Sequence, residues 1–124
     1  IRVLHVDDEP AFGELTAAFL ERADERLVVL TAVSPDDGLS ILREREIDCV
    51  VSDYDMPEED GLWFETQVRM EDPSLPFILY TAHNRDDLPA TNGSEEPIDY
   101  LQKESGTEQF RNLAIRVTSA VGAP

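Results

Sequence analysis

Residues 3–19 read VLHVDDEPAFGELTAAF, and this stretch contains one complete strand-to-helix unit. The apolar run at residues 3–6 has the length and composition of a buried strand. Further along, aromatic and leucine side chains recur at helical spacing behind a proline suited to a first helical turn, which predicts a helix over residues 10–23. The adjacent acids Asp7 and Asp8 therefore fall between the end of a strand and the start of a helix.

The same alternation continues along the rest of the chain. Further strands are predicted over residues 27–32, 48–52, 77–80 and 98–101, and further helices over residues 35–45, 62–70 and 108–121. Residues 84–97 contain Pro89, Pro97 and an Asn-Gly pair, so any helix there is expected to be short or irregular. Alternating strands and helices with right-handed crossovers predict a doubly wound α/β sandwich.

The length of 124 residues is that of a single domain, so we expect one domain over residues 1–124. The chain begins with Ile1 rather than Met, which is compatible with excision from a longer protein. Its single cysteine, Cys49, has no internal partner and lies in an apolar run, which favours a buried thiol in a reducing compartment. Without a membrane-spanning run or a secretory signal, a cytoplasmic protein that does not bind membranes is expected.

The charge of the chain is strongly one-sided, with 27 acidic residues, 10 basic residues and a formal net charge of −17. Such a surface repels nucleic acids, so direct DNA binding by this domain is not expected. The basic residues are nine arginines and one lysine, and this imbalance together with the acid excess predicts a halophilic protein from a cytoplasm at high salt. In a composition that otherwise excludes lysine, Lys103 is expected to have a specific role rather than to be an ordinary surface residue.

Polar side chains follow four of the predicted strands, namely Asp7 with Asp8, then Asp53, Thr81 and Lys103. Because the carboxyl ends of parallel strands meet along one edge of a sheet, we expect these side chains to share a cleft. Taken alone, the acid pair is equally explained by stabilisation of the following helix N-terminus. The further carboxylate favours a metal, because crowded carboxylates need a cation to remain ionised together. The whole set suits Mg²⁺ binding and phosphoryl transfer.

Within this set Asp53 is the predicted nucleophile, since a carboxylate can attack phosphorus in line and form an aspartyl-phosphate. Asp55, inside the loop that follows, is the competing candidate. Thr81 is expected to donate a hydrogen bond to a phosphoryl oxygen, and Lys103 to act as a compact positive charge on the same group. Each of these residues alone also has an ordinary structural explanation, so the prediction depends on their combination.

In this order and spacing, the acid pair, the run VVSDYDMPEEDG at residues 50–61, Thr81 after FILY and the run DYLQK ending at Lys103 resemble the receiver domains of two-component response regulators. The resemblance covers essentially the whole chain. It implies a flavodoxin-like (βα)5 sandwich with the parallel strand order 2-1-3-4-5. It also implies that Asp53 accepts a phosphoryl group from the phosphohistidine of a histidine kinase. The domain would then be a signalling phosphoacceptor with only weak self-phosphorylation and autophosphatase activity, and not an enzyme.

The same resemblance implies a metal site and a conformational switch. The implied Mg²⁺ ligands are the carboxylates of Asp8 and Asp53, the backbone carbonyl of Asp55 and, through water, Asp7. The hydroxyl of Thr81 is expected to move toward the phosphoryl group while the aromatic ring of Tyr100 turns inward. Phosphorylation would in this way favour one of two existing packings.

Three features modify the resemblance. The family usually carries a cis proline after its lysine, whereas Lys103 is followed by Glu104. Because a cis bond before any other residue costs roughly 2.5–4 kcal/mol, we predict a trans peptide here.

The broken stretch at residues 84–97 stands where many relatives carry a helix used for dimerisation or output, which weakens the case for output through that face. His83 lies two residues after Thr81, at a position where side chains in the family obstruct or assist the water that hydrolyses the aspartyl-phosphate. The simpler interpretation of His83 is an exposed loop histidine. The alternative is a residue that tunes the lifetime of the phosphorylated state.

The implied partners are a cognate histidine kinase or phosphotransfer protein and a fused or downstream output domain. The acidic composition and the DYLQKE ending also resemble receiver segments of multidomain archaeal sensor proteins, which implies a halophilic archaeon as the source and makes a receiver within a sensor histidine kinase one alternative. The pair Asp53 and Asp55 suggests a second alternative, a small Mg²⁺-dependent phosphohydrolase of the haloacid dehalogenase type. The motif of that family requires Thr or Val where this chain has Pro57, and the chain is too short to carry the domain that covers the substrate in such enzymes. A domain used only for protein contacts would be expected to lack a site residue, and all are present.

Overall fold

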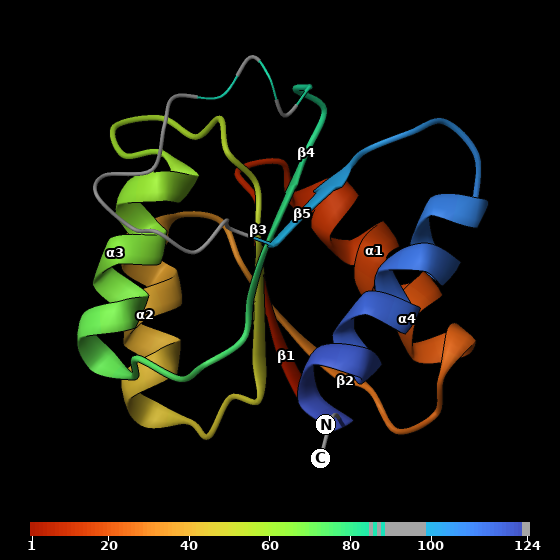
Figure 1. Ribbon diagram of the computed structural model, residues 1–124, viewed down its shortest axis with the longest axis horizontal. Coiled ribbons are helices and arrows are strands. Elements are labelled where there is room, and N and C mark those ends of the chain that lie inside the picture. The colour runs from red at the N-terminus through yellow and green to blue at the C-terminus, as the bar shows by residue number, and fades with distance from the viewer. Residues whose placement is uncertain (85, 87, 89–98, 123–124) are drawn as a thin grey trace.

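The computed structural model describes residues 1–84, 86, 88 and 99–122. Its strands are β1 (Arg2–Val6), β2 (Val28–Ala32), β3 (Cys49–Ser52), β4 (Phe77–Thr81) and β5 (Asp99–Gln102), and its helices are α1 (Pro10–Ala23), α2 (Pro35–Glu44), α3 (Gly61–Glu71) and α4 (Glu108–Gly122). The strands form one parallel sheet in the order β2-β1-β3-β4-β5 (Figure 1). The predicted flavodoxin-like α/β sandwich with strand order 2-1-3-4-5 is confirmed.

Helices cover both faces of the sheet, with α1 and α4 on one side and α2 and α3 on the other (Figure 1). Successive strand residues point to opposite faces, so Val3 packs toward α1 and α4 while Leu4 packs toward α2 and α3. Every residue of β3 and β4 is buried, as are four of the five residues of β1. Burial on both faces explains why these strands read as continuous apolar runs rather than as alternating patterns.

The starts of α2 and α3 are set by local side-chain chemistry. The Ser34 hydroxyl accepts a hydrogen bond of 3.1 Å from the backbone N–H of Asp37, which caps α2. The carboxylate of Asp60 accepts one of 2.9 Å from the backbone N–H of Trp63, which starts α3 at Gly61, one residue before the predicted start.

The remaining differences from the prediction lie at element ends. β2 begins one residue later than predicted, α2 ends at Glu44, and Thr81 belongs to β4 instead of following it. The last strand is described over Asp99–Gln102. The prediction of a short or irregular helix within residues 84–97 concerns positions that lie mostly outside the described residues. No helix in the described part of the chain is both long and apolar enough to cross a membrane.

Candidate functional site

The candidate site lies at the carboxyl ends of β1 and β3, the adjacent strands between which the strand order reverses. Val6 and Ser52 are paired in the register of these strands, so the residues that follow them, Asp7 and Asp53, are neighbours as well. The backbone holds both positions. The N–H of Asp53 donates to the carbonyl of Val6 at 2.9 Å, and the N–H of Asp7 donates to the carbonyl of Ala32 at 3.0 Å.

Three carboxylates meet at this point. One oxygen from each of Asp7, Asp8 and Asp53 lies within 4.8 Å of the other two. Asp7 is 1% exposed and Asp53 8% exposed, whereas Asp8 is half-buried. Burial raises the pKa of Asp53, the ammonium of Lys103 opposes this, and the carboxylate of Asp7 adds to it. Crowded oxygen donors of this kind fit Mg²⁺, which prefers oxygen ligands and would offset the repulsion among them.

The raised pKa of Asp53 predicts a pH-dependent cost to folding when no cation is bound. The folded state holds the proton more tightly than the unfolded state, so ionisation costs stability. This cost is absent below the ordinary pKa of 3.8 and grows as pH rises through the raised folded value. We expect wild type in chelator to lose stability relative to Asp53→Asn as the pH rises from the ordinary pKa of 3.8 through the raised folded pKa, and to lose no more above it. Urea unfolding measures the difference, which Mg²⁺ should reduce at neutral pH; a pH-independent difference would contradict the prediction.

Lys103 reaches the carboxylates from the loop after β5. Its Nζ lies 2.8 Å from Oδ2 of Asp7 and 3.2 Å from Oδ2 of Asp53. The same ammonium lies 4.4 Å from the centre of the Phe12 ring, a cation–π contact that the sequence pattern did not reveal. The peptide from Lys103 to Glu104 is trans, as predicted. The single lysine of the chain therefore bridges two carboxylates, which agrees with a specific role.

The two predicted switch residues both contact the backbone of residue 83. Thr81 is buried at the end of β4, and its Oγ1 accepts a hydrogen bond of 3.3 Å from the N–H of His83. Tyr100 in β5 packs on the side of the sheet that α2 and α3 cover, and its hydroxyl donates to the carbonyl of His83. A displacement of either side chain would therefore break a hydrogen bond to the loop after β4.

Asp55, the competing nucleophile, points elsewhere. Its exposed carboxylate pairs with the imidazole of His83, whose ring also packs edge-on against Tyr54 with centroids 5.4 Å apart. In the described part of the chain, the carboxylate cluster consists of the three other aspartates and does not include the side chain of Asp55. This arrangement favours Asp53 over Asp55 as the nucleophile. Sequence reasoning did not find the pairing with His83, because no spacing rule connects residues 28 positions apart.

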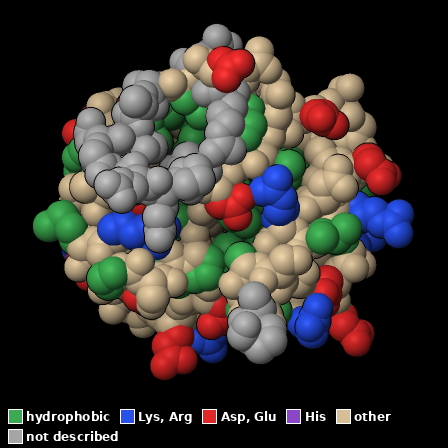
Figure 2. All heavy atoms as spheres, viewed as in Figure 1, with side chains coloured by type: hydrophobic (Ala, Val, Ile, Leu, Met, Phe, Trp, Pro, Cys, Tyr) green, Lys and Arg blue, Asp and Glu red, His purple; other side chains and the backbone are tan. Residues whose placement is uncertain are grey.

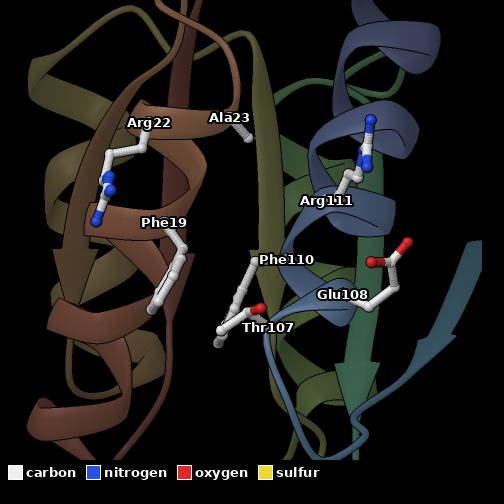
Figure 3. Close-up of a pocket in the computed structure, with 7 residues that line it drawn as sticks. All are labelled: Phe19, Arg22, Ala23, Thr107, Glu108, Phe110 and Arg111. Atoms are coloured by element: carbon white, nitrogen blue, oxygen red, sulfur yellow. The ribbon is translucent and has the colours of Figure 1, made fainter.

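A hollow lies away from the carboxylates, between α1 and α4 (Figure 3). It has a volume of about 470 Å³ and lies beside the stacked rings of Phe19 and Phe110, whose centroids are 4.9 Å apart. The side chains of Arg22 and Arg111 extend along their own helices and do not converge on a common point (Figure 3). Because a small-molecule site needs convergent polar groups, the carboxylate cluster remains the candidate functional site.

Comparison with known proteins agrees with the fold. The family model of the response regulator receiver domain matches residues 3–115. The probable C4-dicarboxylate response regulator DctR of Halalkalibacterium halodurans is 31% identical over 111 residues, which are 90% of this chain and 48% of that protein. The chain belongs to the response regulator receiver domain family of two-component systems. It spans about half the length of this curated relative.

Solved structures show the same architecture. A response regulator receiver domain protein of Clostridium thermocellum has a TM-score of 0.81 at 28% identity, covering 98% of this chain and 94% of that chain. The response regulator TrrA of Thermotoga maritima, solved in complex with Mg²⁺-BeF, has a TM-score of 0.76 at 27% identity and covers 94% of this chain and 97% of that chain. TrrA has also been solved in complex with the histidine kinase ThkA.

Proposed function

We propose that this receiver domain accepts a phosphoryl group on Asp53 from the phosphohistidine of a histidine kinase, in a reaction that requires Mg²⁺. One observation carries the proposal: Oδ2 of Asp53 lies 3.2 Å from the ammonium of Lys103, and the same carboxylate belongs to a cluster with Asp7 and Asp8. A nucleophile, an oxygen ligand set and a compact cation are thereby combined at one sheet edge. The domain is a signalling phosphoacceptor, with self-phosphorylation and autophosphatase activity that are weak.

The residues that would hold Mg²⁺ are the carboxylates of Asp8 and Asp53 and the backbone carbonyl of Asp55, with Asp7 acting through water. When bound, the ion would neutralise negative charge on the oxygens of the phosphoryl group during its transfer. The described cluster of Asp7, Asp8 and Asp53 supports this assignment, since Mg²⁺ sites use one or two carboxylates and retain several waters.

Each remaining side chain has a stated part in the transfer. A carboxylate oxygen of Asp53 attacks phosphorus in line, and the bond from phosphorus to the donor breaks. The ammonium of Lys103 pairs with one phosphoryl oxygen, and the hydroxyl of Thr81 turns away from the loop and donates a hydrogen bond to another phosphoryl oxygen. The Thr81 hydroxyl then exchanges its contact with the N–H of His83 for the phosphoryl group, which frees the loop that Tyr100 also holds. This exchange is the proposed switch.

The proposal is tested by incubating the chain in high-salt buffer with Mg²⁺ and a small-molecule phosphodonor and following the intact mass. A single phosphoryl adduct that hydroxylamine removes, as expected of an acyl phosphate, and that is absent when a chelator removes Mg²⁺ is the expected result. Mg²⁺ binding and folding are verified in parallel. No adduct from either the small donor or a phosphorylated histidine kinase, in a folded protein that binds Mg²⁺, would overturn the proposal.

Lys103→Met separates the role of the ammonium from that of the metal site. The substitution keeps the apolar stem and removes the charge, so the phosphorylation rate is expected to fall on the order of a hundredfold at saturating Mg²⁺. Mg²⁺ is expected to bind more tightly, because the cation that neutralises Asp7 and Asp53 is gone. Mass spectrometry gives the rate and calorimetry gives the affinity. Equal losses of phosphorylation rate and Mg²⁺ affinity would indicate that the lysine only maintains structure.

His83→Ala tests whether the histidine tunes the phosphate lifetime. Its imidazole pairs with Asp55 and packs on Tyr54, both close to Asp53 in the chain, so we expect it to obstruct the attacking water. The aspartyl-phosphate of the variant should decay several-fold faster once the donor is removed. The decay of the adduct mass over time measures this, and an unchanged rate would refute the role.

The proposal extends to partners and location. The donor is a cognate histidine kinase or phosphotransfer protein, as ThkA is found with TrrA. The signal passes to a fused or downstream output domain, in keeping with a relative that is about twice as long. The net charge of −17, with Lys and Arg side chains that lie apart on the face seen in Figure 2, argues against direct nucleic-acid contact. A cytoplasmic location, a single domain over residues 1–124 and a halophilic origin stay predictions.

A further inference from the structure

The loop from β5 to α4 carries Lys103 without the proline that the resembled family uses there. The N–H of Lys103 donates to the carbonyl of Thr81 at 2.7 Å, and this bond continues the pairing of β5 with β4. Beyond it, the peptide to Glu104 is trans and the chain turns away toward α4. Some other feature must therefore fix the loop, because the position of the ammonium depends on the backbone that carries it.

The side chain of Gln109 binds this loop at two points. Gln109 is 6% exposed at the start of α4. Its Oε1 accepts a hydrogen bond of 3.1 Å from the N–H of Glu104, and its Nε2 donates one of 2.8 Å to the carbonyl of Gly106. Gly106 has a φ of +88°, a left-handed conformation that favours glycine. One buried amide thus stabilises the backbone on both sides of the turn after Lys103.

The same amide is anchored in the core by Tyr80. The hydroxyl of Tyr80, a fully buried residue of β4, donates to Oε1 of Gln109. Burial raises the pKa of Tyr80, so the hydroxyl keeps its proton and remains a donor. The Tyr80 ring lies 5.7 Å from the Nζ of Lys103 and 6.0 Å from the Phe12 ring, on which the ammonium sits. Tyr80 therefore contacts the lysine through its ring and the lysine-bearing loop through its hydroxyl.

We infer that Gln109 is a positioning residue, which ties the loop after β5 to Tyr80 and thereby holds the ammonium of Lys103 between Asp7 and Asp53. The inference rests on the proposed function where it concerns phosphoryl transfer, but the placement of Lys103 can be measured without phosphorylation. No local pattern singles out Gln109, because its three partners come from the preceding loop and from β4.

The test uses the fact that Lys103 is the only lysine of the chain. Labelling with ¹⁵N,¹³C-lysine gives one side-chain signal, which the Phe12 and Tyr80 rings should displace from that of free lysine. Gln109→Leu substitutes an apolar side chain of similar size and removes all three hydrogen bonds. Its lysine signal should move toward that of free lysine, and its phosphorylation rate should fall about tenfold at saturating Mg²⁺. Its Mg²⁺ affinity should rise rather than fall, as in Lys103→Met, because the ammonium moves away from the carboxylates of Asp7 and Asp53.

Gln67→Leu, the same substitution in α3 on the other face of the sheet, is the matched control and should leave the lysine signal and the rate unchanged. A folded Gln109→Leu with an unmoved lysine signal would overturn the inference. If Gln109→Leu does not fold, Tyr80→Phe decides, because it removes only the hydroxyl: a displaced lysine signal supports the inference and an unmoved one overturns it. If wild type accepts no phosphoryl group, the proposed function fails, while the lysine signal still decides the positioning role.

Discussion

Asp53→Asn is expected to abolish the phosphoryl adduct completely. The amide keeps the shape of the side chain but is not a nucleophile toward phosphorus, and Asp53 is the proposed nucleophile, buried beside the carboxylates of Asp7 and Asp8 and the ammonium of Lys103. Intact-mass measurement after incubation with donor and Mg²⁺ is the readout. The folded state should survive, since the substitution removes a carboxylate whose raised pKa reflects unfavourable burial and repulsion.

The matched control for this result is Asp55→Asn. The carboxylate of Asp55 pairs with His83 and lies outside the cluster, so the adduct should still form. An adduct that persists in Asp53→Asn and disappears in Asp55→Asn would make Asp55 the phosphoacceptor. If the Asp53→Asn variant still hydrolysed the phosphodonor rapidly, the result would instead support the phosphohydrolase alternative.

Gly61→Ala is expected to destabilise the fold by about 3 kcal/mol and to slow phosphorylation. A Cβ at this position would lie 2.3 Å from the backbone oxygen of Asp53, 3.0 Å from the Cα of Tyr54 and 2.9 Å from Cδ1 of Leu79. The N–H of Gly61 also donates to the carbonyl of Tyr54 at 2.8 Å, so α3 begins directly against the backbone of Asp53 and Tyr54. The clash must therefore move either α3 or Asp53.

Gly122→Ala is the control for this prediction, because a Cβ there meets nothing within 4 Å. Its free energy of unfolding should differ from that of wild type by less than about 0.5 kcal/mol. Urea unfolding of the three proteins gives the stabilities, and the adduct assay gives the rates. A Gly61→Ala protein as stable as wild type would mean that the start of α3 is free to move away from Asp53.

The candidate site was predictable from sequence to the extent that it depends on strand ends. Asp7 and Asp53 follow short apolar runs, and parallel strands bring such positions together whatever the details of packing. The assignment of Mg²⁺ ligands and of the switch residues Thr81 and Tyr100 came from the family resemblance. Those roles remain predictions, whereas the meeting of the three carboxylates is observed.

The alternation of strands and helices and the chemical content of the sheet edge can be read from the sequence, because apolar periodicity and helix capping act between residues close in the chain. Three contacts follow only from the packing of the folded chain: Lys103 bridges to Asp7 across 96 positions, Asp55 pairs with His83, and Gln109 connects its loop to Tyr80 in the core. Such contacts depend on how whole elements pack and on which buried polar groups then need partners. No local pattern carries that information.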